Sequence, residues 1–218
     1  IPGSDHARAV SAIELLRDIS NSEGFEVPHK AVVIGGGNVA MDIARSLARF
    51  QKAEYGEIDV TVTALEAQDQ MLADEDEIRE SREEGIIIMP SRGPRRCFIQ
   101  GDRLTGLETV LCSSVFDDEG RFHPIFDESD VIIHDADLVV EAIGQAADIS
   151  YLGEQVTEAL EWQRGRLQVD RQGHTAEAWL WAAGDLVEGP DVVHAVAAGH
   201  RVAADIDEYL LKRKARDA

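Results

Sequence analysis

Two glycines and a small residue, Gly35, Gly37 and Ala40, stand at the spacing G-x-G-x-x-G/A. The first glycine permits a sharp turn, the second lets the backbone approach a pyrophosphate, and the small third residue lets a helix pack closely on a strand. Asn38 and Val39 would open that helix, so its free N–H groups and positive end would face the phosphates. The spacing predicts a dinucleotide-binding turn; a glycine turn in a domain that binds nothing is the alternative.

The residues on either side predict the elements that hold this turn. Residues 31–34 form an apolar, β-branched run that is typical of a parallel strand buried on both faces. From residue 38 onward, apolar residues recur at helical spacing, whereas Asp42, Arg45 and Arg49 lie on the opposite side. Strand, turn and helix therefore follow in the order that the dinucleotide motif requires.

The rest of the chain alternates strands and helices, with one interruption. Further strands are predicted at residues 60–65, 85–90 and 137–145, with an acidic helix that ends at Gly85. Between residues 95 and 134, short β-prone runs alternate with turns, which predicts an antiparallel meander. The fold class is α/β, a Rossmann-like parallel sheet with an inserted antiparallel β meander.

Helices are also predicted near both ends of the chain. The first covers residues 7–19, capped by Ser4 or Asp5, and is expected to stand apart from the nucleotide unit. The last covers residues 191–211. The remaining expectations are a polar loop at 51–59, a solvated loop carrying Arg92, Arg95 and Arg96, and short strands at 167–170 and 179–185.

Composition limits the partners. The 42 acidic residues outnumber 21 basic ones, and the formal net charge of -21 argues against nucleic acid or an anionic membrane as partner. Cys97 and Cys112 form neither a C-x-x-C pair nor a cluster at metal-ligand spacing, so no metal site is predicted and a reducing cytoplasm is the expected setting. No apolar run approaches the length of a membrane span.

Three segments, at 32–45, 137–145 and 181–203, carry a resemblance to a known family. They read V-V-I-G-G-G-N-V-A-M-D-I-A-R, D-L-V-V-E-A-I-G-Q and W-A-A-G-D-L-V-E-G-P-D-V-V-H-A-V-A-A-G-H-R-V-A. Together they resemble the two-dinucleotide-binding-domain flavoproteins, most closely the small subunit of glutamate synthase and its relatives. The opening I-P-G-S-D-H-A-R-A-V-S-A-I-E-L-L-R resembles the family's connection from the flavin domain into the nicotinamide domain.

The resemblance implies an interrupted domain order. Residues 1–29 would be the N-terminal connecting segment of a flavin-type domain, residues 30–144 the NAD(P)-binding domain, and residues 145–218 the C-terminal part of the flavin-type domain. That flavin-type domain would be incomplete, because its own G-x-G-x-x-G unit is absent from the chain. Since the chain also does not begin with methionine, it is expected to be a fragment, inactive on its own.

The resemblance also implies cofactor ligands. Gly35, Gly37 and Asn38 would hold the pyrophosphate of NAD(P)H, and Gly144 would let the nicotinamide half lie close. Gly184 and Asp185 would follow a strand, with the Asp185 carboxylate accepting hydrogen bonds from the ribityl chain of FAD in the full-length protein.

Glu66, at the tip of the second predicted strand, is expected to set the cofactor preference. An acid there accepts hydrogen bonds from the ribose hydroxyls and repels a 2′-phosphate. Residues 67–77 contain no arginine, and Arg79 and Arg82 are expected to lie too far along the next helix. NADH is therefore predicted to bind in preference to NADPH, unless Glu66 points to solvent.

By the same resemblance, the full-length protein would pass a hydride from NAD(P)H to FAD. Electrons would then leave through an iron–sulfur domain or subunit to a larger catalytic subunit. Such a transfer needs rings held in position rather than an acid or base, so no catalytic side chain is predicted. Two rivals stay open: a disulfide reductase of the thioredoxin reductase type, which would need a C-x-x-C pair, and a non-catalytic nucleotide-binding or interaction module.

Overall fold

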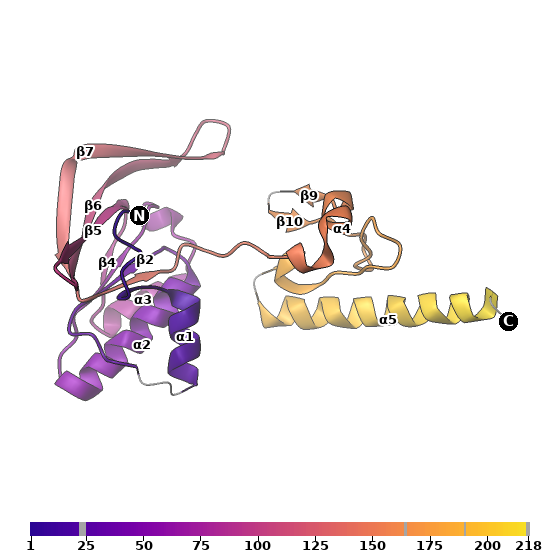
Figure 1. Cartoon of the computed structure of the whole chain (residues 1–218), viewed down its shortest axis with the longest axis horizontal. Coiled ribbons are helices and arrows are strands. Elements are labelled where there is room, and N and C mark those ends of the chain that lie inside the picture. The colour runs from indigo at the N-terminus through magenta and orange to yellow at the C-terminus, as the bar shows by residue number, and fades with distance from the viewer. Residues whose placement is uncertain (22–24, 164, 190, 217–218) are drawn as a thin grey trace. The chain divides into compact units, whose positions relative to one another are not determined.

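The computed structural model describes residues 1–21, 25–163, 165–189 and 191–216 (Figure 1). The chain divides into two compact units, Ile1–Gly144 and Gln145–Ala218. Part of the predicted connecting segment, residues 22–24, lies outside the described residues. Among the described residues, no helix is long and apolar enough to cross a membrane.

A five-stranded parallel sheet forms the centre of the first unit, in the order β1-β8-β2-β3-β4. The central strand β2 pairs with β8 on one side and with β3 on the other, and all four of its residues are buried, as its apolar run predicts. The strands are β1 (Ala9–Ser11), β2 (Ala31–Ile34), β3 (Val60–Thr63), β4 (Ile87–Met89) and β8 (Leu138–Glu141).

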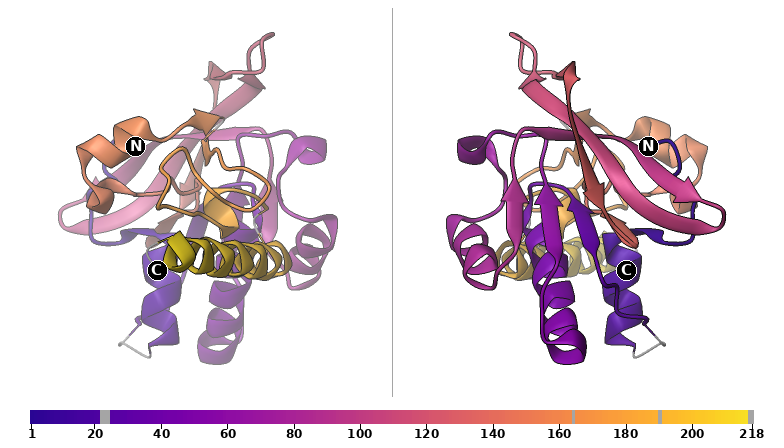
Figure 2. Two further views of the ribbon diagram at one scale, coloured as in Figure 1. Left: turned by 90° about the vertical axis from the view of Figure 1, so that its right-hand side faces the viewer. Right: turned by 90° about the vertical axis from the view of Figure 1, so that its left-hand side faces the viewer.

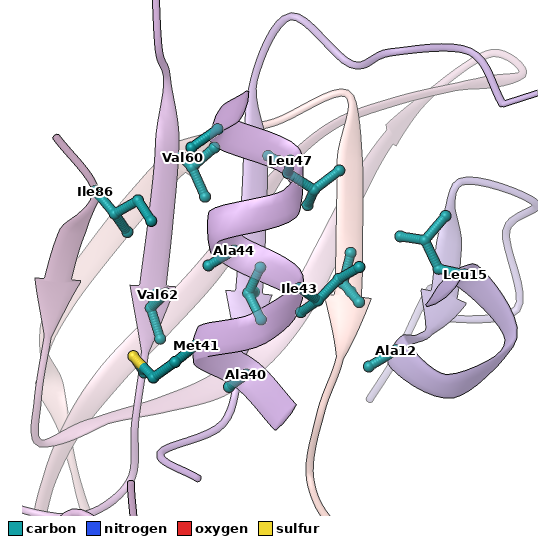
Figure 3. Packing of buried hydrophobic residues seen from close by; sticks show 14 of the residues in the cluster. Ala12, Leu15, Ala40, Met41, Ile43, Ala44, Leu47, Val60, Val62 and Ile86 are labelled. Atoms are coloured by element: carbon teal, nitrogen blue, oxygen red, sulfur yellow. The ribbon is translucent and has the colours of Figure 1, made fainter. Parts of the chain in front are cut away.

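Helices cover one face of this sheet and an antiparallel sheet covers the other (Figures 1 and 2). Because side chains alternate along a strand, Val33 of β2 packs under the helices and Val32 packs under the antiparallel sheet. Figure 3 shows the helix side of the core, where Ile43 and Leu47 of α2 meet the sheet. The covering elements are α1 (Ala12–Ser20), α2 (Asn38–Tyr55), α3 (Glu75–Glu83), β5 (Arg92–Gln100), β6 (Arg103–Phe116) and β7 (Phe122–Asp135). The predicted parallel sheet with an inserted meander is confirmed.

Arg45 fastens α3 to α2. Its guanidinium lies 2.6 Å from Glu77, 2.7 Å from Glu80 and 2.9 Å from Glu84, with only 15% of its side chain exposed. Glu84 is also 2.7 Å from Arg49, and the hydrogen bonds from Arg49 and then from Arg45 hold the pKa of Glu84 below its ordinary value. One arginine with three carboxylates therefore fixes where α3 lies along α2.

The opening segment departs from the prediction. Residues 9–11 form β1, which pairs with β8, and α1 begins only after Ser11. Ala12 and Leu15 join the core of the first unit. The expected cap at Ser4 or Asp5 is wrong, and the described part of this segment lies in the same unit as the glycine turn. The sequence did not indicate β1, because a three-residue strand is too short to show an alternating pattern.

Two polar stretches were also expected wrongly as loops. α2 continues past Gln51 to Tyr55 and ends where Gly56 adopts a left-handed φ of 78°. The arginine cluster lies in β5, where Arg92 pairs with Asp130 at 2.7 Å, and Arg95 and Arg96 pair with acids too. Polar composition suggested loops because the sequence does not show that Gln51 is buried or that the arginines of β5 have acidic partners.

The second unit contains short elements and one long helix. They are η2 (Ser150–Leu152), α4 (Glu154–Ala159), β9 (Trp162–Gln163), β10 (Arg166–Leu167), η3 (Gly184–Leu186) and α5 (Val192–Arg216). The predicted strand at 167–170 is only β10. The strand at 179–185 is wrong, because in the described residues a single bridge to His174 pairs Trp181. Trp181 instead stacks on His174 with ring centroids 4.4 Å apart and donates a hydrogen bond of 2.8 Å to Asp205 of α5.

A buried glutamine holds the entries to two strands of the first unit. Gln51 is 1% exposed, and its amide nitrogen donates to the carbonyls of Pro28 at 3.0 Å and Asp59 at 3.2 Å. Its amide oxygen accepts a 2.7 Å hydrogen bond from the Asp59 N–H. Gln51→Ala leaves these backbone groups without their partner, so it should lower the free energy of unfolding by about 3 kcal/mol.

Urea denaturation followed by circular dichroism measures this loss. The exposed Glu54, on the same helix, supplies the control Glu54→Ala, which should stay within about 0.5 kcal/mol of the parent. All three tryptophans lie in the second unit, so their fluorescence is an internal reference that Gln51→Ala should leave unchanged. Equal stability of the two variants would contradict the prediction.

Candidate dinucleotide-binding site

The turn after β2 is wedged against the end of β8. Gly35 has a φ of 145°, and a Cβ built on it would lie 2.3 Å from the carbonyl oxygen of Ala142. The Gly35 N–H donates a 2.8 Å hydrogen bond to the backbone carbonyl of Thr63, and the Ala142 N–H donates one of 2.8 Å to the backbone carbonyl of Ile34. Only glycine fits this position, because any side chain would collide with backbone.

Gly37 occupies open space at the start of α2. Its φ of -100° is ordinary, and a Cβ built on it would meet nothing within 4 Å. Within the described residues no side chain caps this end of α2, and its first turn holds no acidic residue. The N–H groups that a helix cannot satisfy internally are therefore open to an anion. The space beside them is free because position 37 has no side chain.

The next residues of the motif divide between solvent and core. Val39 is 40% exposed, whereas Ala40 is fully buried among the residues that α2 packs on the sheet. The small side chain at position 40 lets the first turn of α2 lie close to β2.

Glu66 follows β3 and leans over the glycine turn. Its Oε2 lies 2.7 Å from the point that a Cβ on Gly36 would occupy. Its carbonyl accepts a 2.8 Å hydrogen bond from Ser91, whose φ of 56° is left-handed although it is not a glycine. The backbone at the tip of β3 is thus pinned, and the carboxylate lies beside the turn.

The side chain of Asn38 contacts the loop before α3. Its Nδ2 donates to Oδ2 of Asp74 at 3.0 Å, and its Oδ1 accepts from the Asp74 N–H at 2.8 Å. These two bonds direct the Asn38 side chain toward the loop, whereas its backbone N–H stands at the open start of α2. No spacing pattern in the sequence indicates Asp74, which lies 36 residues further along the chain.

The two arginines nearest to Glu66 in the following helix make different contacts. The guanidinium of Arg82 reaches back to the side chain of Gln68, in the short helix η1 (Gln68–Gln70) that follows Glu66. Arg79 instead pairs with Asp76 on its own helix. Arg82 thus contacts the segment that follows Glu66, whereas the expectation that both arginines lie too far along α3 to reach the ribose stays a prediction.

Gly144 completes the group in the first unit. It stands two residues beyond Ala142, has a φ of 92°, and a Cβ there would meet nothing within 4 Å. The structure thus gathers seven of the predicted residues at the carboxyl ends of β2, β3 and β8: Gly35, Gly37, Asn38, Val39, Ala40, Glu66 and Gly144. The sequence analysis missed Gly36, Asp74 and Ala142, whose roles depend on contacts distant in sequence.

The sequence of most of the chain matches a known protein family. The family described as pyridine nucleotide-disulphide oxidoreductase matches residues 1–199. The chain belongs to this family. Gly184, with a φ of 74°, and the exposed Asp185 are the predicted flavin ligands, and they lie in η3 of the second unit, away from the glycine turn in sequence.

Several relatives are subunits of larger oxidoreductases. The β subunit of NADP(+)-dependent formate dehydrogenase from Moorella thermoacetica is 34% identical over 92% of this chain and 28% of its own length. The NAD-dependent dihydropyrimidine dehydrogenase subunit PreT of Escherichia coli K12 is 30% identical over 96% of this chain and 44% of its length. The small chain of NADPH glutamate synthase from Halomonas elongata is 30% identical over 96% and 46%. The chain thus spans less than half the length of these relatives.

Solved structures share the fold. T. acidophilum thioredoxin reductase superposes with a TM-score of 0.71 at 17% identity, over 97% of this chain and 61% of that one. FprA of Mycobacterium tuberculosis in complex with NADPH superposes with a TM-score of 0.71 at 15% identity, over 100% and 62%. At such identities the likeness shows the fold alone.

The two cysteines of this family member are buried in the first unit. Cys97 is 8% exposed and Cys112 is 4% exposed, and both are free thiols. Burial is the main cause that raises the pKa of each; the charge of Glu141 adds to it at Cys97 and that of Glu66 at Cys112. Across the described part of the chain, no three histidine, cysteine or acidic side chains gather as a metal site.

Both thiols should therefore react slowly in the folded protein. Burial limits access, and a raised pKa lowers the fraction of reactive thiolate at neutral pH. We expect Ellman's reagent to modify Cys97 and Cys112 at least about tenfold more slowly in the native chain than in the chain unfolded in urea. Fast modification of either thiol in the folded chain would contradict this expectation and favour a redox-active cysteine.

Proposed function

We propose that the first unit binds a nicotinamide dinucleotide, with its pyrophosphate at the amino end of α2. The observation that carries the proposal is the open space at Gly37, beside a helix start with no side-chain cap in the described residues. The N–H groups of Gly37, Asn38 and Val39 would donate to the phosphate oxygens. When bound, the nicotinamide ring supplies or accepts a hydride.

The order of the strands supports the same placement. In doubly wound sheets, ligands bind outside the carboxyl ends of the strands where the strand order reverses. Here the chain runs from β2 to β3 on one side, whereas β8 lies on the other side of β2. Gly144, beyond β8, would face the nicotinamide half, and Glu66, beyond β3, would face the adenosine ribose.

Gly37→Val should abolish binding and leave the fold intact. Its φ of -100° suits any residue and no atom obstructs the new side chain, so the only loss is space for the pyrophosphate. Calorimetric titration with NADH, together with circular dichroism, measures both effects. Gly199→Val is the matched control, because a Cβ at that exposed position of α5 also meets nothing within 4 Å. Unchanged affinity in Gly37→Val would mean that the nucleotide binds elsewhere.

We also propose that the chain prefers NADH to NADPH. The Glu66 carboxylate beside Gly36 would accept hydrogen bonds from the ribose hydroxyls and repel a 2′-phosphate. The relatives carry both NAD and NADP in their names, so they do not decide between the two. Arg82 is the opposing candidate, since its guanidinium reaches Gln68, two residues beyond Glu66.

Parallel titration with NADH and NADPH tests this preference. We expect about tenfold tighter binding of NADH, since one close charge repulsion at partial exposure is worth on the order of a kcal/mol. Glu66→Arg should shift the preference toward NADPH, and Glu66→Gln should reduce it. Arg82→Ala is the matched control and should leave NADH binding unchanged. Equal affinities in the parent chain, or NADPH binding that is lost in Arg82→Ala, would show that Glu66 does not set the choice.

For the longer protein we propose an electron-transfer flavoprotein. Residues 1–29 and 145–218 would contribute to a flavin-type domain, with Gly184 and Asp185 near FAD. The protein would pass a hydride from NAD(P)H to FAD and deliver electrons through an iron–sulfur domain or subunit to a larger catalytic subunit in the cytoplasm. Relatives named as subunits support this, as does α5, where Val192 and Val193 are each 77% exposed.

Two alternatives remain distinct from this proposal. A disulfide reductase would need an accessible cysteine pair, whereas Cys97 and Cys112 are both buried. A non-catalytic nucleotide-binding or interaction module would carry no flavin. Absorbance of the natural full-length protein in the flavin region separates the last case, because a colourless protein would favour the module.

A further inference from the structure

We infer that Asn38 and Asp74 form a positioning pair that holds the glycine turn in the shape that accepts the dinucleotide. This inference rests on the proposed nucleotide site. The pair joins the first residue of α2 to the residue that precedes α3 by two reciprocal hydrogen bonds, of 2.8 Å and 3.0 Å. Next to it, the Ala73 N–H donates to the Gly36 carbonyl at 2.8 Å. Three hydrogen bonds thus tie the loop before α3 to the turn.

These bonds fall on either side of the position that the ligand needs. Gly36 and Asn38 are the neighbours of Gly37, and both are bound to the loop. Gly35 on the preceding side is fixed against β8. Glycine has more backbone freedom than any other residue. Fixing the residues on both sides of Gly37 therefore reduces the conformational entropy that would be lost when the dinucleotide binds.

The side chains of Asn38 and Asp74 bond to each other's residues and not to the first turns of their own helices. Asp74 stands at the N-cap of α3, where an aspartate normally accepts a hydrogen bond from the first turn of its own helix. Its side chain makes no such bond in the described structure, and the carboxylate accepts from Asn38 instead. Asn38 likewise gives its amide to Asp74. Both polar groups are used to join the two helix starts.

The loop itself is placed by the ion cluster on α3. Arg45 on α2 contacts Glu77 and Glu84, so α3 begins at a fixed point relative to the turn. Asn38 and Asp74 are both exposed, so their bonds contribute modestly to the stability of the whole unit. Their effect should therefore be felt in binding more than in folding.

The geometry predicts unequal effects of the two truncations. Asn38→Ala removes both reciprocal bonds, whereas Asp74→Ala removes only the one to its carboxylate, because the backbone N–H of residue 74 remains. We expect the Kd for NADH to rise about tenfold in Asn38→Ala and about threefold in Asp74→Ala. The double variant should match Asn38→Ala, since no bond is left for the second change to remove.

A swap of the two side chains provides a rescue that a general loss of packing would not allow. Asn38→Asp alone places two carboxylates face to face and should weaken binding by more than about tenfold. Adding Asp74→Asn restores a donor on one side and an acceptor on the other, so affinity should recover at least about fivefold relative to Asn38→Asp. Asp74→Asn alone keeps both bonds, because an amide oxygen replaces the carboxylate oxygen, and should bind within about twofold of the parent.

The experiment is calorimetric titration of the whole chain with NADH. The control is Asp76→Ala, which removes the ion pair with Arg79 on the outside of the same helix. If the parent does not bind NADH, the proposed function fails. If the parent binds and Asn38→Ala binds equally well, or the swap gives no recovery, the positioning pair is overturned. If Asn38→Ala does not fold, the inference is decided by the swap, whose recovery relative to Asn38→Asp supports the pair and whose failure overturns it.

Discussion

The first unit depends on a close approach between the backbone of Gly35 and the carbonyl oxygen of Ala142, which leaves no room for a side chain at position 35. β2 and β8 are parallel neighbours with Ile34 opposite Glu141, so the backbone leaves both strands at the same edge of the sheet. A Cβ at position 35 would force them apart, since it would lie 2.3 Å from that oxygen. Because Gly35 allows the approach, the chain turns at once and α2 begins over the sheet.

The helix after the turn keeps the turn in place. Ile43 and Leu47 of α2 are fully buried against the sheet, so the helix cannot tilt away from β2 without exposing them. Two distant segments then fix the turn and the residue beside it. The loop before α3 binds Gly36 and Asn38, while the left-handed Ser91 pins the backbone of Glu66. The candidate site is therefore made by four separate parts of the sequence, each held by contacts outside the site.

The parts that the sequence could predict are those with a local signal. The apolar run at 31–34, the glycine spacing and the helical period after residue 38 describe the strand, turn and helix correctly. The position of Glu66 also followed from its place at a strand end. The wrong expectations have the opposite character: residues 9–11 and 179–185 depend on whether a neighbouring strand is present, and a β-prone run without a partner does not become a strand. The Asn38–Asp74 pair and the reach of Arg82 to Gln68 depend on how α3 docks, which no periodicity encodes.

Charge explains why the turn would bind a dinucleotide by backbone rather than by basic side chains. The chain carries a formal net charge of -21, and arginines of the two helices that follow the turn are already bound to acids in the described structure, Arg45 of α2 to three glutamates and Arg79 of α3 to Asp76. A pyrophosphate at this edge would meet helix N–H groups, whose partial charges act within the first turn. In the proposed site, the Glu66 carboxylate beside Gly36 would face a further phosphate on the ribose. If the dinucleotide binds as proposed, an acidic site that holds its pyrophosphate through backbone N–H donors would discriminate between NADH and NADPH by where the extra phosphate of NADPH falls.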